Sequence, residues 1–161
     1  MVVVEAGDAG EAFARLVADV FDAAGVLRRQ GEEIAAVAGQ TQARWQLMSV
    51  VSDGDWTVPM AGDRLGTSRQ AVQRVANELV DEGLAEFRDN PHHRRSPFLR
   101  LTSRGHRTLT AITRRARERH AEIHHDLATI DITAVQAGLR QLTALIRHQL
   151  DGGAVGDGSA R

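Results

Sequence analysis

The sequence of 161 residues contains no cysteine and no lysine, and all 20 of its basic residues are arginine. Without cysteine the chain cannot form disulfides, a thiolate zinc site or a thiol redox sensor. Without lysine it cannot use Schiff-base chemistry or the lysine of a phosphate-binding loop. We therefore expect no catalytic residues and no cofactor.

Long apolar runs are also missing, because nowhere do 18 apolar residues follow one another. The segment Met1–Phe13 has a short apolar run with acids directly after it and no basic start, unlike a secretory signal. These features predict no membrane association and a cytoplasmic protein.

Apolar residues recur every three or four positions at both ends of the chain. This period predicts a helix over about residues 8–38, a second from about 103 whose apolar stripe reaches Leu127, and a last one over about 133–150. The tail 151–161 is rich in glycine and small residues and is expected to be disordered. A length of 161 residues and a hydrophobic content of 42% favour a single domain over 1–161.

The middle of the chain carries the signals of three short helices, of which the second and third are joined by a tight turn. Thr41 is placed to cap one helix, and Thr57, with Pro59 behind it, to cap another that ends at Leu65. Gly66 then turns the chain, and Thr67 or Ser68 begins a helix that runs to about Glu82. This order predicts a helix-turn-helix.

A hairpin is predicted directly after these helices. Residues 84–88 and 97–101 have the composition of short strands, and the polar, basic loop 89–96 between them is typical of a wing. The expected fold class is therefore α+β, mostly α, with a winged helix-turn-helix over about 41–102.

The overall charge of −1 hides an uneven distribution. Residues 64–119 hold 13 arginines and 6 acids, a net charge of +7, whereas the remainder is acidic. A basic middle with acidic ends indicates a polyanionic partner.

Two elements of this basic region carry side chains that suit DNA. Arginine can donate to both acceptors of guanine in the major groove, and glutamine can pair with adenine. The helix from Ser68 presents such residues opposite its apolar face, and arginines flank the predicted wing. A solvated amphipathic helix and an ordinary charged hairpin would show the same patterns. The polar-face residues are Arg69, Gln70, Gln73, Arg74 and Asn77, and the wing residues are Arg88, Arg94 and Arg95.

The segment Thr41–Gly105 resembles the multiple antibiotic resistance regulator (MarR) family, most specifically at Leu79–Leu84 and at Leu101–Gly105. The resemblance implies a homodimeric transcription regulator, by family habit a repressor, that binds palindromic double-stranded DNA. It implies dimerisation through about 8–38 and 103–150, with the recognition helix in the major groove and the wing in the minor groove. The DNA contacts that it implies are Ser68, Arg69, Gln70, Gln73, Arg74, Arg94 and Arg95.

The chain departs from the family pattern at two places. His93 stands where the family commonly has the aspartate that orients a wing arginine. In the first helix of the motif, Ala61 and Gly62 replace a large apolar residue and alanine.

The resemblance also implies a pocket for a small effector. The residues expected to line it are apolar and aromatic with one cation, which suits an aromatic carboxylate. Tryptophan and methionine at helical spacing are also typical of plain core. The lining residues are Val20, Ala24, Arg44, Trp45, Met48 and Trp56.

Two other functions remain open. His120 and His124 lie four residues apart, a spacing that on one helix could hold a regulatory metal together with Glu122 or Asp126. Ala121 and Ile123 occupy the places where metallohydrolase motifs require glutamate, so the pattern does not predict an enzyme. The long outer helices would also suit a protein-interaction module without DNA binding.

Overall fold

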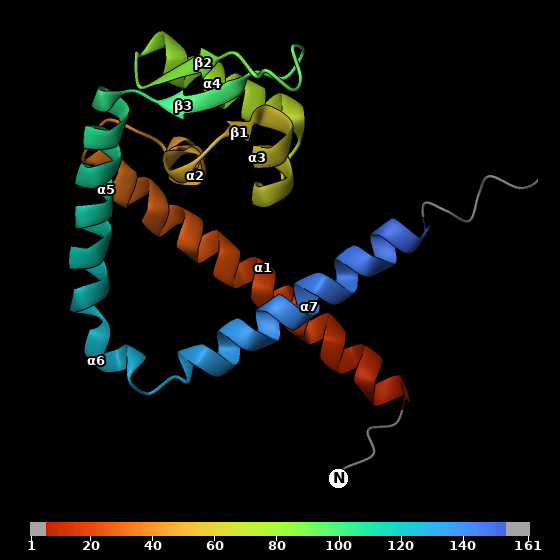
Figure 1. Ribbon diagram of the computed structural model, residues 1–161. Coiled ribbons are helices and arrows are strands. Elements are labelled where there is room, and N and C mark those ends of the chain that lie inside the picture. Colours follow the sequence, from red (N-terminus) through yellow and green to blue (C-terminus); the bar gives the residue numbers. More distant parts are fainter. Residues whose placement is uncertain (1–5, 154–161) are drawn as a thin grey trace, which may run out of the picture. The chain divides into compact units, whose positions relative to one another are not determined.

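The computed structural model describes residues 6–153, and the side chains of 8–150. The chain divides into two compact units, residues 1–117 and 118–161. The elements of Figure 1 are α1 (Ala6–Ala36), α2 (Gln42–Val50), the 3-10 turn η1 (Val51–Asp53), β1 (Trp56–Thr57), α3 (Val58–Leu65), α4 (Arg69–Asp81), β2 (Ala85–Arg88), β3 (Phe98–Leu101), α5 (Ser103–Glu122), α6 (His124–Leu127) and α7 (Ile132–Gly153).

The first unit holds a winged helix core made of α2, α3, α4 and a small sheet, and the end of α1 packs on it (Figure 1). Its centre is formed by apolar side chains that lose almost all contact with solvent. These include Leu47, Met48, Leu79, Leu84, Leu99 and Ile112. The mostly helical winged fold predicted from the sequence is confirmed.

Side-chain caps begin the three short helices where the sequence predicts them. The hydroxyl of Thr41 accepts a hydrogen bond from the backbone NH of Arg44 at 3.3 Å, and that of Thr57 accepts from Met60 at 3.4 Å. Ser68, rather than Thr67, caps α4 and accepts from Ala71 at 3.2 Å. Such caps satisfy NH groups that the first turn leaves without partners.

The sheet has one more strand than the sequence predicts. The two predicted strands pair antiparallel, with Glu86 opposite Arg100 and Phe87 opposite Leu99. The unpredicted β1 pairs with the other edge of β3, giving the order β1-β3-β2. With only two residues, β1 is too short to show the alternation by which a strand is recognised.

The predicted long helix from 103 through 127 is wrong at its end. The α-helix stops at Glu122, and α6 begins at His124, with Ile123 as a non-helical residue between them. In the final helix, α7 continues to Gly153, three residues beyond the predicted end. The rest of the tail predicted to be disordered lies outside the described residues.

The outer helices leave much of their apolar surface in contact with solvent. On α1, Phe21 is 73% exposed and Leu27 is 63% exposed. On α7, described as part of the second unit, Val135, Leu139 and Leu145 are all about half exposed. Neither set of side chains therefore completes a core within its own unit.

Over the described part of the chain, no helix combines the length and apolar character needed to span a bilayer.

Candidate nucleic-acid interface

Helix α4 presents a polar face to solvent because its apolar face is committed to the core. Val72, Val75, Ala76 and Leu79 are buried. The backbone enters the helix through a left-handed turn at Gly66 (φ 64°), and the NH of Thr67 donates to the carbonyl of Gly62 at 3.1 Å. The predicted contact residues left on the exposed side are Ser68, Arg69, Gln70, Gln73 and Arg74.

Gly62 belongs to one of the two departures from the family pattern, and its lack of a side chain permits a close backbone contact. A Cβ atom at this position would lie 3.1 Å from the carbonyl oxygen of Thr67. The glycine therefore lets α3 come close to the residues that begin the recognition helix.

The wing is held by a buried amide rather than by the family's ion pair. The Oδ1 atom of Asn90 accepts hydrogen bonds from the backbone NH groups of His92 and His93 at 3.0 and 3.2 Å. Its Nδ2 atom donates to the carbonyl of Ser96 at 2.9 Å, and the residue is only 6% exposed. A buried amide with three hydrogen bonds fixes the loop that carries Arg94 and Arg95, although His93 replaces the usual aspartate.

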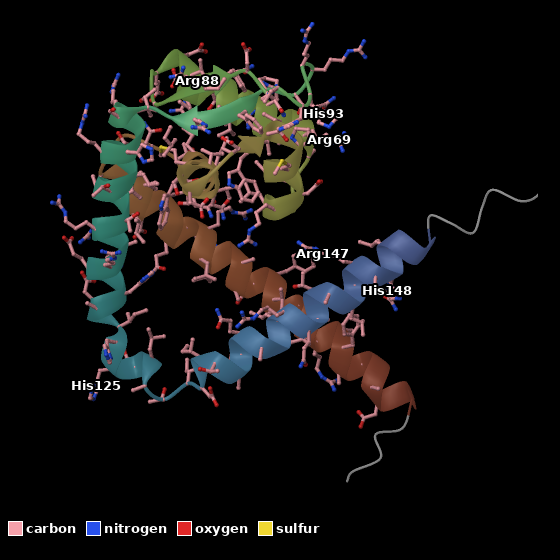
Figure 2. The ribbon with its side chains drawn as sticks, in the orientation of Figure 1. Arg69, Arg88, His93, His125, Arg147 and His148 are labelled. Carbon is pink, nitrogen blue, oxygen red and sulfur yellow. The ribbon has the colours of Figure 1, made fainter. Side chains whose placement is uncertain are left out.

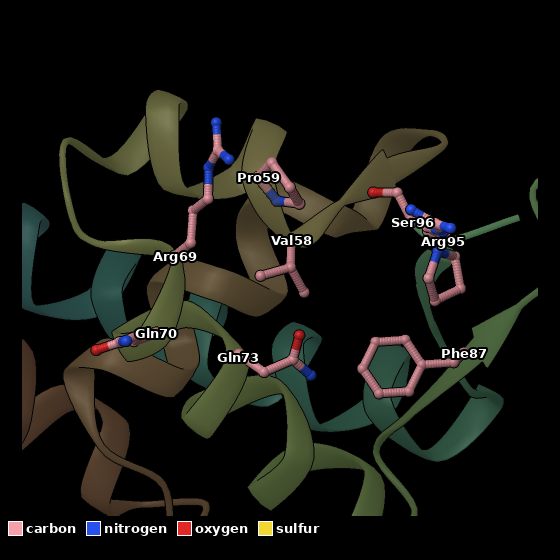
Figure 3. Close-up of a pocket in the computed structure, with 9 residues that line it drawn as sticks. Val58, Pro59, Arg69, Gln70, Gln73, Phe87, Arg95 and Ser96 are labelled. Atoms are coloured by element: carbon pink, nitrogen blue, oxygen red, sulfur yellow. The ribbon is translucent and has the colours of Figure 1, made fainter. Parts of the chain in front are cut away.

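Helix α4 and the wing meet at one concave surface of about 380 Å³. Figure 3 shows Arg69, Gln70 and Gln73 on one side of it and Phe87, Arg95 and Ser96 on the other. Val58 and Pro59, at the start of α3, line it between these two groups. The two predicted groups of DNA-contacting residues are therefore brought together on one face of the first unit.

The arginines of this face differ in whether they are already paired. Arg74 contacts Glu78 at 2.9 Å and Arg88 contacts Glu86 at 2.7 Å. Within the described chain, Arg69, Arg94 and Arg95 make no ion pair and are exposed (Arg69 is labelled in Figure 2). Unpaired guanidinium groups keep all five of their NH donors for phosphates or base edges.

A cluster of charged and amide side chains joins α2 to α4. Arg44 of α2 is 16% exposed and contacts Glu78 at 3.0 Å through Nε and Glu82 at 2.5 Å through Nη1. Gln40, also buried, donates to Glu82 at 3.0 Å. The partial burial of Arg44 acts to lower its pKa, but the two glutamates outweigh this effect and raise it. The pKa of Glu82 is lowered, first by the hydrogen bond from Gln40 and then by Arg44.

The residues predicted to line an effector pocket have different surroundings. Met48 is completely buried in the core, and Ala24 is exposed on α1. Trp45 and Trp56 are half-buried against the core. Arg44, expected to anchor an acidic ligand, already binds two carboxylates. Val20 is half-buried as well.

The predicted metal-binding pair does not lie on one continuous helix. His120 is in the last turn of α5 and His124 begins α6, with the break at Ile123 between them. Glu122, the nearest acid named for this site, contacts Arg119 at 2.5 Å. Across the residues that the structure describes, no group of three or more histidine or acidic side chains is arranged to hold a metal.

Two residues of this site were missed in the sequence. Asn90 precedes Pro91, and an Asn-Pro pair is a known signal of a turn held by the asparagine side chain. Glu78 lies four residues after Arg74, a spacing at which helical side chains of opposite charge meet. Both signals were readable from spacing alone.

Comparison with known proteins gives two kinds of match. The profile of the MarR family matches residues 38–96. An uncharacterized protein of Mycobacterium tuberculosis (strain H37Rv) is 58% identical over 134 residues, which cover 83% of this chain and 91% of that protein. An uncharacterized protein of Mycobacterium bovis matches with the same values.

Solved structures with the same fold agree with the family match. The crystal structure of a MarR family transcription regulator is 25% identical and has a TM-score of 0.63, covering 91% of this chain and 97% of that one. The M. tuberculosis transcriptional regulator MosR in complex with DNA is 20% identical and has a TM-score of 0.69, covering 82% and 96%. With its capped helix-turn-helix, its wing and these matches, the chain belongs to the MarR family of transcription regulators, which are not enzymes.

Proposed function

We propose that this chain represses transcription as a homodimer that binds a palindromic operator, with α4 in the major groove and the wing in the minor groove. The observation that carries the proposal is the shared surface of Figure 3, where base-reading side chains of α4 and a wing arginine line one concavity. A duplex that enters this surface would meet both elements at once.

The two elements would contribute in different ways. Arg69 lies at the first position of α4, where a recognition helix contacts base edges. Gln70 and Gln73 follow on the exposed side of the same helix. Arg94 and Arg95 extend from the wing, where they would meet phosphates or the negative potential of a narrow minor groove. The helix would supply base identity and the wing affinity.

The exposed apolar side chains of the outer helices support the homodimer. Leaving an apolar surface wet costs about 25 cal/mol per Å². Phe21 and Leu27 on α1, and Leu139 and Leu145 on α7, are each between 45% and 73% exposed. A second copy of the chain would cover them and, by symmetry, present two recognition helices to two half-sites.

The proposed release of the operator by a small aromatic acid has a specific chemical requirement. Because Arg44 already binds Glu78 and Glu82, an effector carboxylate would have to compete with these side chains. The half-buried Trp45 and Trp56 supply an aromatic surface and a fluorescent reporter. Titration of salicylate-like acids should quench tryptophan fluorescence and release operator DNA in parallel. Quenching without release of DNA would contradict regulation by the ligand. The absence of both quenching and release would contradict the pocket itself.

Selection of bound duplexes from a random pool tests the proposal as a whole. We expect a palindrome with half-sites roughly 10 bp apart, and an affinity that falls steeply with salt. Heparin-column retention at low salt gives a second readout. A protein-interaction module would select no sequence and would elute without strong salt dependence. That result would overturn the proposal.

A further inference from the structure

Arg74, a predicted base-reading residue, is held by the side chain of Glu78. Its Nη1 atom contacts Glu78 Oε1 at 2.9 Å, one turn further along α4. The arginine is 71% exposed, whereas Glu78 is 33% exposed. The contact therefore joins Arg74, a long side chain at the surface, to the less exposed Glu78.

Glu78 is itself fixed from the other side. Its second oxygen, Oε2, accepts a hydrogen bond from Arg44 Nε at 3.0 Å. Arg44 is only 16% exposed, and its Nη1 atom is bound by Glu82 at 2.5 Å. Each oxygen of Glu78 thus has one arginine partner, and the inner arginine is anchored between α2 and α4.

The geometry leaves the outer arginine able to read DNA. A guanidinium group has five NH donors in a rigid fork, and the hydrogen bond to Glu78 uses only the Nη1 atom of Arg74. The remaining edge can still donate two parallel hydrogen bonds to the O6 and N7 atoms of guanine. Arginine loses considerable rotamer entropy when it is immobilised, and a partner that holds it beforehand reduces that loss on binding.

We propose that Glu78 is a positioning residue for base recognition, held by Arg44 through one oxygen and orienting Arg74 toward guanine through the other. This inference rests on the proposed function, since it assigns a role within the α4 interface. It predicts that Glu78 determines preference at one base pair, the same pair that Arg74 reads.

The chain offers a matched control in Glu82. Both glutamates pair with Arg44, and replacing either by alanine changes the net charge by the same amount, but it is Glu78 that pairs with Arg74. Glu78→Ala should reduce discrimination at the Arg74 base pair about 2- to 10-fold. Glu82→Ala should leave that discrimination unchanged, and Glu78→Gln, which keeps an oxygen acceptor, should retain part of it.

The experiment measures the affinity of the full-length chain for the selected operator, for operators substituted at each base pair, and for random duplex. Adding Glu78→Ala to Arg74→Ala should cause no further loss at the shared base pair. Equal effects of Glu78→Ala and Glu82→Ala, or a uniform change at all base pairs, would overturn the positioning role. If Arg74→Ala itself changes no base preference, the result contradicts the proposed function, in which α4 recognises the bases, rather than the positioning role of Glu78.

Discussion

The winged part of the first unit and the outer helix α7 differ in whether their apolar side chains are buried. Helix α4 places four side chains in a core shared with its neighbours. Along residues 132–150 of α7, by contrast, no described side chain is buried, although the apolar period is equally clear. Periodicity therefore says which face will be covered but not whether the same chain covers it. The winged region has a core of its own, whereas the apolar stripe of α7 stays largely exposed.

The largest expected effect comes from breaking the packing of the winged region. A Cβ atom at Gly105 would lie 2.0 Å from the backbone oxygen of Leu84, so the start of α5 would have to separate from the sheet. Gly105→Ala should lower the free energy of unfolding by about 3 kcal/mol or more, at the upper end of overpacking effects. Urea denaturation measures it. Gly10→Ala on α1, with open space around the site, is the control and should not destabilise the chain.

The second largest effect tests whether the outer helices, rather than the winged region, hold the proposed dimer together. Leu139→Glu places a charge in the apolar stripe of α7 and should raise the dimer dissociation constant about 100-fold or more, because both copies lose an exposed leucine that the proposed interface would bury. Sedimentation equilibrium measures the change. Gln141→Glu, two residues away on the same exposed helix, should leave the dimer intact. A parent chain that stays monomeric at micromolar concentration would contradict the proposed assembly.

A third comparison divides the winged region itself into a reading part and an affinity part. Arg69→Ala should weaken specific binding by about 1 to 3 kcal/mol, the value of one bidentate base contact. Replacing Arg94 and Arg95 together by alanine should flatten the plot of log affinity against log salt and preserve base preference. Fluorescence anisotropy with operator and random duplexes at several salt concentrations measures both. An unchanged slope would remove the wing from the interface.

The parts of this molecule that the sequence predicts are those controlled by local chemistry. Thr41, Thr57 and Ser68 begin helices because a hydroxyl two or three residues upstream of free NH groups can bond them in any tertiary setting. The residue types of the α4 face follow from the helical period. The apolar stripes of the outer helices follow from the same rule.

The parts that it does not predict depend on contacts between distant residues. Strand β1 exists because β3 offers it a pairing edge. Arg44 was expected to be a free cation, but carboxylates 34 and 38 residues away bind it. The break at Ile123 separates His120 from His124, and the helical spacing gives no sign of it.

The smallest expected effect concerns the cluster that joins Gln40 and the α2 residue Arg44 to the end of α4. The hydrogen bond from Gln40, together with Arg44, lowers the pKa of Glu82 in the folded chain. A carboxyl with a lowered folded pKa stabilises the fold above its unfolded pKa, near 4.5, and this contribution is lost as the pH falls through the folded pKa. Glu82→Gln removes this titration, so the parent should be more stable than the variant at pH 6, and the gap should narrow toward pH 3. Because the carboxylate is 39% exposed, the gap should stay below about 1 kcal/mol.

Urea denaturation across this pH range measures the gap, and Gln40→Leu locates its cause. That variant keeps the carboxylate but loses the hydrogen bond that contributes most to the lowered pKa of Glu82. The acid-induced loss of stability should therefore be smaller in Gln40→Leu than in the parent and should end at a higher pH, because the folded pKa of Glu82 lies closer to its unfolded pKa. A gap between parent and Glu82→Gln that stays constant from pH 6 to pH 3 would show that Glu82 contributes no charge-dependent stability. The contact between α2 and α4 would then depend on packing around Arg44 rather than on its carboxylate partners.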